Sequence, residues 1–93
     1  MNINAKNVKF RNSWEMLEKD NININVDTIE FHKSDIKLEN LKIKCNLLEF
    51  NNTNIWCFNE MCLDTNLIIS ESSKLKANNK IIINNTNCDE IKK

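Results

Sequence analysis

Two similar segments of the chain each carry a glutamate at the same position. The segment at 29–40 reads IEFHKSDIKLEN and the segment at 48–59 reads LEFNNTNIWCFN, so Glu30 and Glu49 are equivalent residues. If the segments stack, the two carboxylates become neighbours of like charge, which raises the pKa of one of them and permits acid–base chemistry. No long loop is available to build a cleft around the pair. We therefore expect no catalytic residue, no cofactor and no enzymatic activity.

His32 is the single histidine of the chain. Histidine is the side chain best suited to acid–base work near neutral pH. In the repeat described below, however, His32 falls in an outward-facing column with Arg11, Asn51 and Glu71. We interpret it as an ordinary surface residue.

The four cysteines lie at positions 45, 57, 62 and 88. Cys57 and Cys62 form a C-x4-C pair, which is a spacing that zinc sites use, but a structural zinc site needs a second pair of ligands. The chain has no such pair, and nothing resembling a secretory signal favours disulfides. We predict free thiols that act as small apolar side chains, and no bound metal.

Three outward-facing residues, Lys37, Trp56 and Lys76, occupy equivalent positions about twenty residues apart. Lysines above and below a tryptophan can make cation–π contacts worth about 0.5–1 kcal/mol each when exposed. Such a column is either a covered surface tryptophan, an aromatic anchor for a protein partner, or a stacking platform for single-stranded nucleic acid.

Three further outward positions are apolar where the repeat elsewhere carries charge: Cys62, Ile69 and Ile82. Clustered apolar side chains on a surface usually mark an interface. Together with Lys37, Trp56 and Lys76, these residues are the predicted partner-binding set.

The elements that position all these residues follow from a repeat. Five segments share the frame apolar-x-small-x-x-apolar-x-apolar, at offsets of 21, 19, 20 and 20 residues: INAKNVKF (3–10), INVDTIEF (24–31), IKCNLLEF (43–50), LDTNLIIS (63–70) and, more weakly, INNTNCDE (83–90). Each unit contains three short stretches of period two, which is the period of a β-strand. Stacked coils let each strand pair with its counterpart about 4.8 Å away.

The repeat predicts an all-β fold in one domain over 1–93, a parallel β-helix of about four coils of 19–21 residues. A right-handed coil is preferred, because the left-handed hexapeptide type favours glycine and this chain has none. The frame assigns the following residues to the core: Ile3, Val8, Phe10, Ile24, Val26, Ile29, Phe31, Ile36, Leu38, Leu41, Ile43, Cys45, Leu48, Phe50, Ile55, Cys57, Met61, Leu63, Ile68, Leu75, Ile81 and Ile83.

The two ends of the coil read differently. Ser13 followed by WEMLEKD is typical of a capped helical turn, so we predict a short helix at 13–19 that covers the N-terminal end. No helix signal follows the strand KIIINN at 80–85, which would leave that strand as an unprotected edge.

In its periodicity the chain from Ile3 to Cys88 resembles parallel β-helix proteins of the bactofilin kind. The resemblance implies a short solenoid with compact coils and polar turns, and bactofilins polymerise. The chain departs from their composition in having no glycine.

The function we expect is a non-enzymatic protein–protein interaction module. Basic and acidic residues balance at 13 each, no segment is apolar enough to cross a membrane, and the N-terminal segment lacks a signal-peptide core, so we expect a cytoplasmic protein. Its composition follows an AT-rich genome and fits a small inhibitor from a phage or mobile element. We expect a homodimer through the C-terminal half, or a foreign protein partner. The alternative is nucleic-acid binding through Lys37, Trp56 and Lys76.

Overall fold

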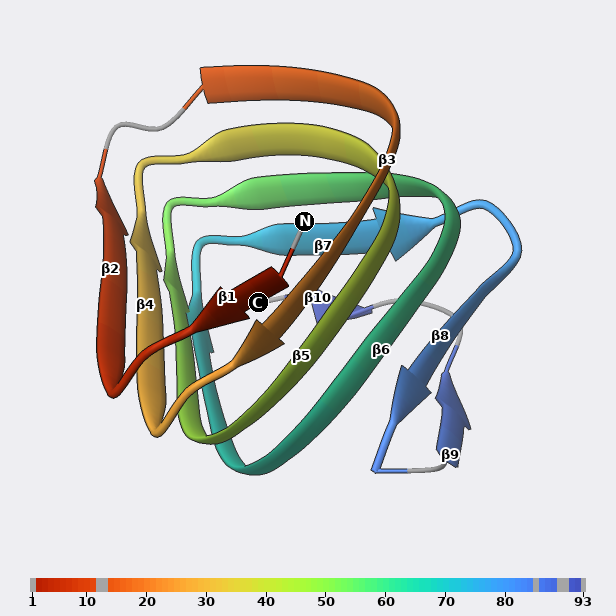
Figure 1. Ribbon diagram of the computed structural model, residues 1–93. Helices are drawn as coiled ribbons and strands as arrows, with labels where there is room; N and C mark the ends of the chain where they lie inside the picture. Colours follow the sequence, from red (N-terminus) through yellow and green to blue (C-terminus); the bar gives the residue numbers. More distant parts are fainter. Residues whose placement is uncertain (1, 12–13, 85, 89–90, 93) are drawn as a thin grey trace.

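The computed structural model describes residues 2–11, 14–84, 86–88 and 91–92, with side chains over 2–11 and 21–84. The described chain winds into a parallel β-solenoid of about four turns (Figure 1), which confirms the predicted architecture. Its strands are β1 (Asn2–Asn4), β2 (Asn7–Arg11), β3 (Trp14–Asn25), β4 (Thr28–His32), β5 (Asp35–Asn51), β6 (Asn54–Glu71), β7 (Lys74–Ala77), β8 (Lys80–Ile83), β9 (Thr86–Cys88) and β10 (Ile91–Lys92). No described helix is long and apolar enough to cross a membrane.

Each coil has three faces, and the long strands bend around the corners between them (Figure 1). One face stacks β1 on the second half of β3 and on the middle of β5 and β6, ending at β8. The next face stacks β2, β4 and the last parts of β5 and β6. The third face stacks the first parts of β3, β5 and β6 on β7. Equivalent residues therefore lie side by side in columns that run along the solenoid.

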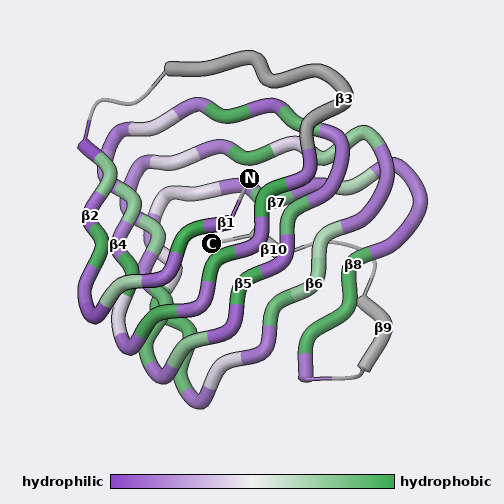
Figure 2. Tube along the Cα trace, in the orientation of Figure 1, coloured by the Kyte–Doolittle hydropathy of each residue, from purple (hydrophilic) through white to green (hydrophobic). Residues whose placement is uncertain are grey.

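The core follows the alternation of apolar and polar residues along the strands (Figure 2). Every apolar side chain that is buried among the described residues belongs to the predicted core set. Ile3, Val8 and Phe10, from the first coil, pack against this core but are only half-buried. The inward assignment is therefore confirmed from the first coil to Ile81.

Three phenylalanines form a ladder inside the solenoid. The rings of Phe10 and Phe31 stack with centroids 4.9 Å apart, and those of Phe31 and Phe50 with centroids 5.3 Å apart. Ser70 pairs with Phe50 and takes the fourth position of the column. Within the part of the chain that the structure describes, its buried hydroxyl has no hydrogen-bond partner, and the ring of Phe50 beside it offers no acceptor. The ladder thus ends where the repeat begins to fade.

Polar columns secure the corners. The amide of Thr53 donates to Ser73 Oγ at 3.0 Å, and the amide of Ser34 donates to Thr53 Oγ1 at 3.4 Å. Another column joins asparagine side chains: Asn40 Nδ2 donates to Asn21 Oδ1 at 2.6 Å, and Asn59 Nδ2 donates to Asn40 Oδ1 at 2.8 Å. The Ser/Thr column therefore carries hydrogen bonds from coil to coil.

The predicted capping helix at 13–19 is wrong. Residue 13 lies outside the described residues, and Trp14 begins β3, whose backbone pairs with β5 from Trp14↔Asp35 to Leu17↔Leu38. The parallel ladder gives this segment backbone partners from Trp14 to Leu17, whereas one helical turn satisfies few of its own backbone groups. Tertiary pairing therefore outweighs the local capping pattern.

The predicted bare edge at the C-terminal end is also wrong for β8. The chain turns back after Asn84, which has a positive φ of 48°, and β9 pairs antiparallel with β8. β10 then pairs antiparallel with β7. Two of the three faces are thus closed at this end by the tail of the same chain.

Replacing Phe50 by Ala should lower the free energy of unfolding by about 3–5 kcal/mol, because Phe50 is fully buried and its loss leaves a cavity between Phe31 and Ser70. Urea unfolding followed by circular dichroism measures this change. The exposed Leu67 serves as a control, since Leu67→Ala should cost less than about 1 kcal/mol. Equal losses in the two variants would contradict the assigned core.

Replacing Lys33 by Gly should raise the free energy of unfolding by about 0.5–1 kcal/mol. Lys33 has a φ of 50°, a left-handed conformation that strains a residue with a Cβ atom but not glycine. Asn52, at the equivalent corner with a φ of 49°, is the matched control, because asparagine tolerates this region and Asn52→Gly should gain less. Thermal or urea unfolding separates the two, and a destabilised Lys33→Gly variant would contradict the expectation.

Candidate functional site

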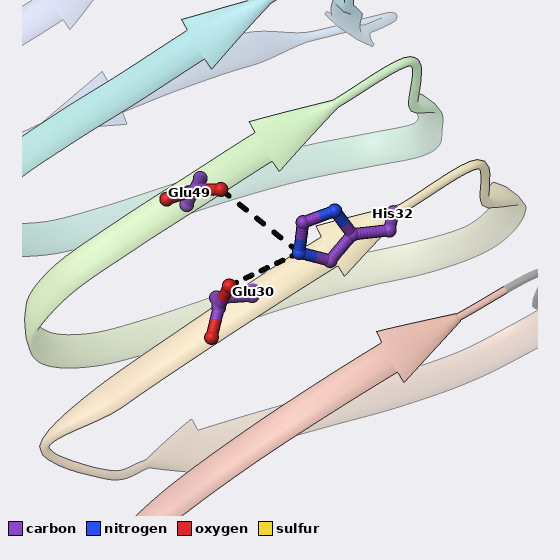
Figure 3. Close-up of side chains that lie close together, drawn as sticks. All are labelled: Glu30, His32 and Glu49. Atoms are coloured by element: carbon purple, nitrogen blue, oxygen red, sulfur yellow. Dashed lines mark hydrogen bonds and ion pairs between the residues drawn. The ribbon is translucent and has the colours of Figure 1, made fainter.

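The outer face of β4 and β5 brings together Glu30, His32 and Glu49 (Figure 3). His32 Nε2 lies 3.0 Å from Glu30 Oε1 and 3.9 Å from Glu49 Oε2. One nitrogen or oxygen atom from each of the three side chains lies within 4.8 Å of the others. All three side chains are roughly one-quarter to one-third exposed, so the cluster is open to solvent.

The positions of these residues follow from the strand period and the register. Glu30 and His32 are two apart on β4, so both point outward, while their neighbours Ile29 and Phe31 are buried. Glu30 pairs with Glu49 across the ladder, as the sequence alignment predicts. His32 is paired with Asn51, but its ring reaches back between the two carboxylates (Figure 3). This diagonal contact is what the column assignment alone misses.

The electrostatics of the pair differ from the expectation of a carboxylate with a raised pKa. The pKa of Glu30 lies below its ordinary value of 4.5, chiefly because His32 hydrogen-bonds the carboxylate. Partial burial opposes this effect, and the charge of Lys9, whose Nζ is 3.6 Å from Glu30 Oε2, adds to it. Glu30 is therefore ionised at neutral pH. The cluster offers one imidazole nitrogen and carboxylate oxygens to a ligand, without an enclosing cleft.

The predicted column of Lys37, Trp56 and Lys76 is present. The two lysine Nζ atoms lie 5.8 Å and 5.4 Å from the ring centroid of Trp56, on residues that pair with it from either side. Trp56 Nε1 donates to Asn78 Oδ1 at 2.9 Å, and Phe58 meets the ring edge-on. The lysines already occupy the sites above and below the indole, which disfavours the stacking of a nucleic-acid base there.

The predicted apolar patch divides between two faces. Cys62 pairs with Ile82 on the face that ends at β8, whereas Ile69 lies on the next face, beyond the corner at Asn66. Both Cys62 and Ile82 are only partly exposed, while 42% of Ile69 is exposed. Leu67, which the repeat frame does not single out, is 55% exposed and lies two residues from Ile69. The sequence does mark Leu67, because it is an apolar residue at a position of the repeat that faces solvent.

Cys45, Cys57 and Cys62 are free cysteines. Cys57 is fully buried, and burial raises the pKa of its thiol to about 12. In the absence of a metal ion the thiol is therefore protonated and packs as a small apolar side chain. The C-x4-C spacing thus places one of its members in the core.

The depressed pKa of Glu30 predicts how stability depends on pH. A carboxylate whose pKa is lower in the folded than in the unfolded state stabilises the fold fully at pH values above its unfolded-state pKa. This contribution is lost as the pH falls through the folded-state pKa. Wild type should therefore unfold at a higher urea concentration than Glu30→Gln at pH 7, and the difference should shrink as the pH falls below 4.5 and through the lower pKa of folded Glu30. A difference that persists unchanged at low pH would contradict this assignment.

No protein family, curated protein or solved structure matches this chain. The solenoid is therefore supported by the geometry of the chain itself, and the resemblance to bactofilins concerns architecture alone.

Proposed function

We propose that this protein is a non-enzymatic interaction module that pairs with a second copy of itself through the N-terminal end of the solenoid. The observation that carries the proposal is the uncovered first coil. β1 pairs with β3, β2 with β4, and the first part of β3 with β5. Within the described ranges no strand lies on the other side of these three segments.

An uncovered coil leaves two kinds of group in need of partners. The outer strands present backbone N–H and C=O groups that readily pair with another strand. The end of the core is also incompletely covered, because Ile3, Val8 and Phe10 are half-buried while their counterparts Ile24, Ile29 and Phe31 are buried. Solenoids need their terminal coils covered for both reasons.

A second copy of the chain fits this end because its first coil has the same three-sided outline. Stacking head to tail is disfavoured, since β9 and β10 already occupy the edges of β8 and β7 at the opposite end. When two N-terminal ends meet about a twofold axis, the open end of each copy is covered, and neither copy has an open N-terminal end left to bind a third. It yields a dimer and not a filament.

In such a dimer the strands of the two copies run antiparallel. If the twofold axis passes through the face of β2, that strand pairs with its own counterpart, with Lys9 on the axis. Val8 then faces Phe10 of the second copy, which extends the apolar core across the interface. The two Lys9 side chains would repel each other, but each lies 3.6 Å from a Glu30 carboxylate that offsets its charge.

The C-terminal half offers a competing surface. The last part of β6, from Leu67 to Glu71, pairs with β5 on one side, and no other described strand pairs with it. Leu67 and Ile69 are exposed along it. A dimer through this half, or a foreign target protein that adds a strand to this edge, are the alternatives. We rank them second because one face is open here, against three at the N-terminal end.

We infer a right-handed coil and a cytoplasmic location on the grounds given with the sequence. Nucleic-acid binding through Lys37, Trp56 and Lys76 is the least favoured function, because the lysines cover the ring that would stack on a base.

Light scattering on the wild type and on two matched lysine variants tests the proposal. At high micromolar concentration the wild type should have the mass of a dimer. Phe10→Lys places a charge at the open N-terminal end and should yield a monomer. Ile82→Lys alters a half-buried apolar residue on the face closed by β9, and should leave the dimer intact. Circular dichroism of both variants checks that they are folded.

Cross-linking adds a measurement that does not depend on disrupting the core. Lys9→Cys should form a disulfide-linked dimer on mild oxidation, whereas Lys76→Cys, on the third face, should not. A monomeric wild type would reject self-association and favour a foreign partner. A dimer that Ile82→Lys splits and Phe10→Lys does not would move the interface to the C-terminal half.

A further inference from the structure

We infer that Glu30, His32 and Glu49 form a binding site for one divalent transition-metal ion, for which Zn²⁺ is the natural probe. The inference does not require the proposed dimer, because all three ligands belong to one chain. From the sequence no metal is expected, because the cysteines lack a second pair of ligands. The structure instead brings together an imidazole and two carboxylates that come from neighbouring strands (Figure 3).

The separations suit such an ion. Zinc binds histidine nitrogen and carboxylate oxygen at about 2.0–2.2 Å, so ligand atoms around a tetrahedral ion lie roughly 3.3 Å apart. In the cluster, His32 Nε2 lies 3.0 Å from Glu30 Oε1 and 3.9 Å from Glu49 Oε2. Small side-chain rotations would bring the three atoms to one centre. The remaining coordination position faces solvent.

The backbone holds these ligands in place. Glu30 and His32 flank the buried Phe31, and Glu49 lies between the buried Leu48 and Phe50. The two strands are paired in continuous register from Thr28↔Leu47 to His32↔Asn51. The three side chains therefore start from fixed positions on a rigid surface, which limits the entropy lost when an ion binds.

The charges of the cluster leave a place for a cation. Two carboxylates share one histidine, and within the described residues the 3.9 Å contact to His32 is the sole ion pair of Glu49. Lys9 balances one charge from the side of Glu30 Oε2, and leaves Oε1 beside the imidazole. Arg11 is paired with His32 on the neighbouring strand and adds positive charge nearby. These two cations should weaken metal binding without blocking it.

The opposing role of Lys9 makes the test sharp. If the cluster is merely an ion pair, removing Lys9 creates no affinity for metals. If the cluster is a metal site, Lys9→Met removes a competing positive charge from Glu30 and should tighten binding. This variant gains a property instead of losing one, and circular dichroism must show that it is folded, because an unfolded chain could bind zinc through its exposed cysteines.

Isothermal titration of the full chain with ZnCl₂ should show one ion bound per chain. His32→Gln and Glu49→Gln should each weaken binding by about tenfold or more. At known metal sites, loss of a residue that only hydrogen-bonds to a ligand already weakens binding by that factor. Two controls should bind as the wild type does. Glu60→Gln removes a carboxylate paired with Lys80 on another face, and Cys62→Ser removes a partly exposed thiol. Circular dichroism checks the fold of each variant.

Three results would overturn the inference. Zinc binding that survives both His32→Gln and Glu49→Gln would place the ion elsewhere. Binding lost in Cys62→Ser would assign it to thiols. Absence of binding at millimolar zinc, in the wild type and in Lys9→Met, would show that the cluster is an ion pair alone.

Discussion

The in-register pairing of each coil with the next is the constraint on which this structure depends. Parallel strands place every residue beside its counterpart about twenty positions away, so a side chain meets others of its own column. Apolar columns become the core, with the stacked rings of Phe10, Phe31 and Phe50 at its centre. Polar columns become hydrogen-bonded ladders at the corners. The same rule sets Glu30 beside Glu49, where like charges must find a common partner.

That rule explains why much of the fold is predictable from the sequence. A period of two along strands and of about twenty between coils determines which residues face inward, and both periods can be read without a structure. The asparagines show the limit of compositional reasoning. An AT-rich genome would account for their abundance, yet Asn21, Asn40 and Asn59 bond to one another along a corner. A biased composition can therefore still be used by the fold.

The features that were not predictable lie where periodicity stops. At 14–19 a local helix pattern competes with the ladder and loses, because the next coil supplies backbone partners. After Asn84 the repeat fades, and no periodic signal encodes a strand that reverses direction to pair with β8. The candidate site fails to emerge for a third reason. The side chain of His32 points diagonally toward Glu30 and Glu49. Aligning the repeats shows which residues are neighbours in a column, but not the direction in which a side chain points.

The reversal of the tail also bears on how the chain is made. Every parallel pairing joins a strand to residues about twenty positions earlier, so each coil can settle on the one before it as the polypeptide leaves the ribosome. Each coil formed in this way leaves an open edge on which another coil could pair. β9 and β10 break the rule by pairing backwards, with residues only about three to eighteen positions away. By occupying the edges of β8 and β7, they take the positions on which the strands of a further coil would pair, so parallel winding cannot continue on those two faces.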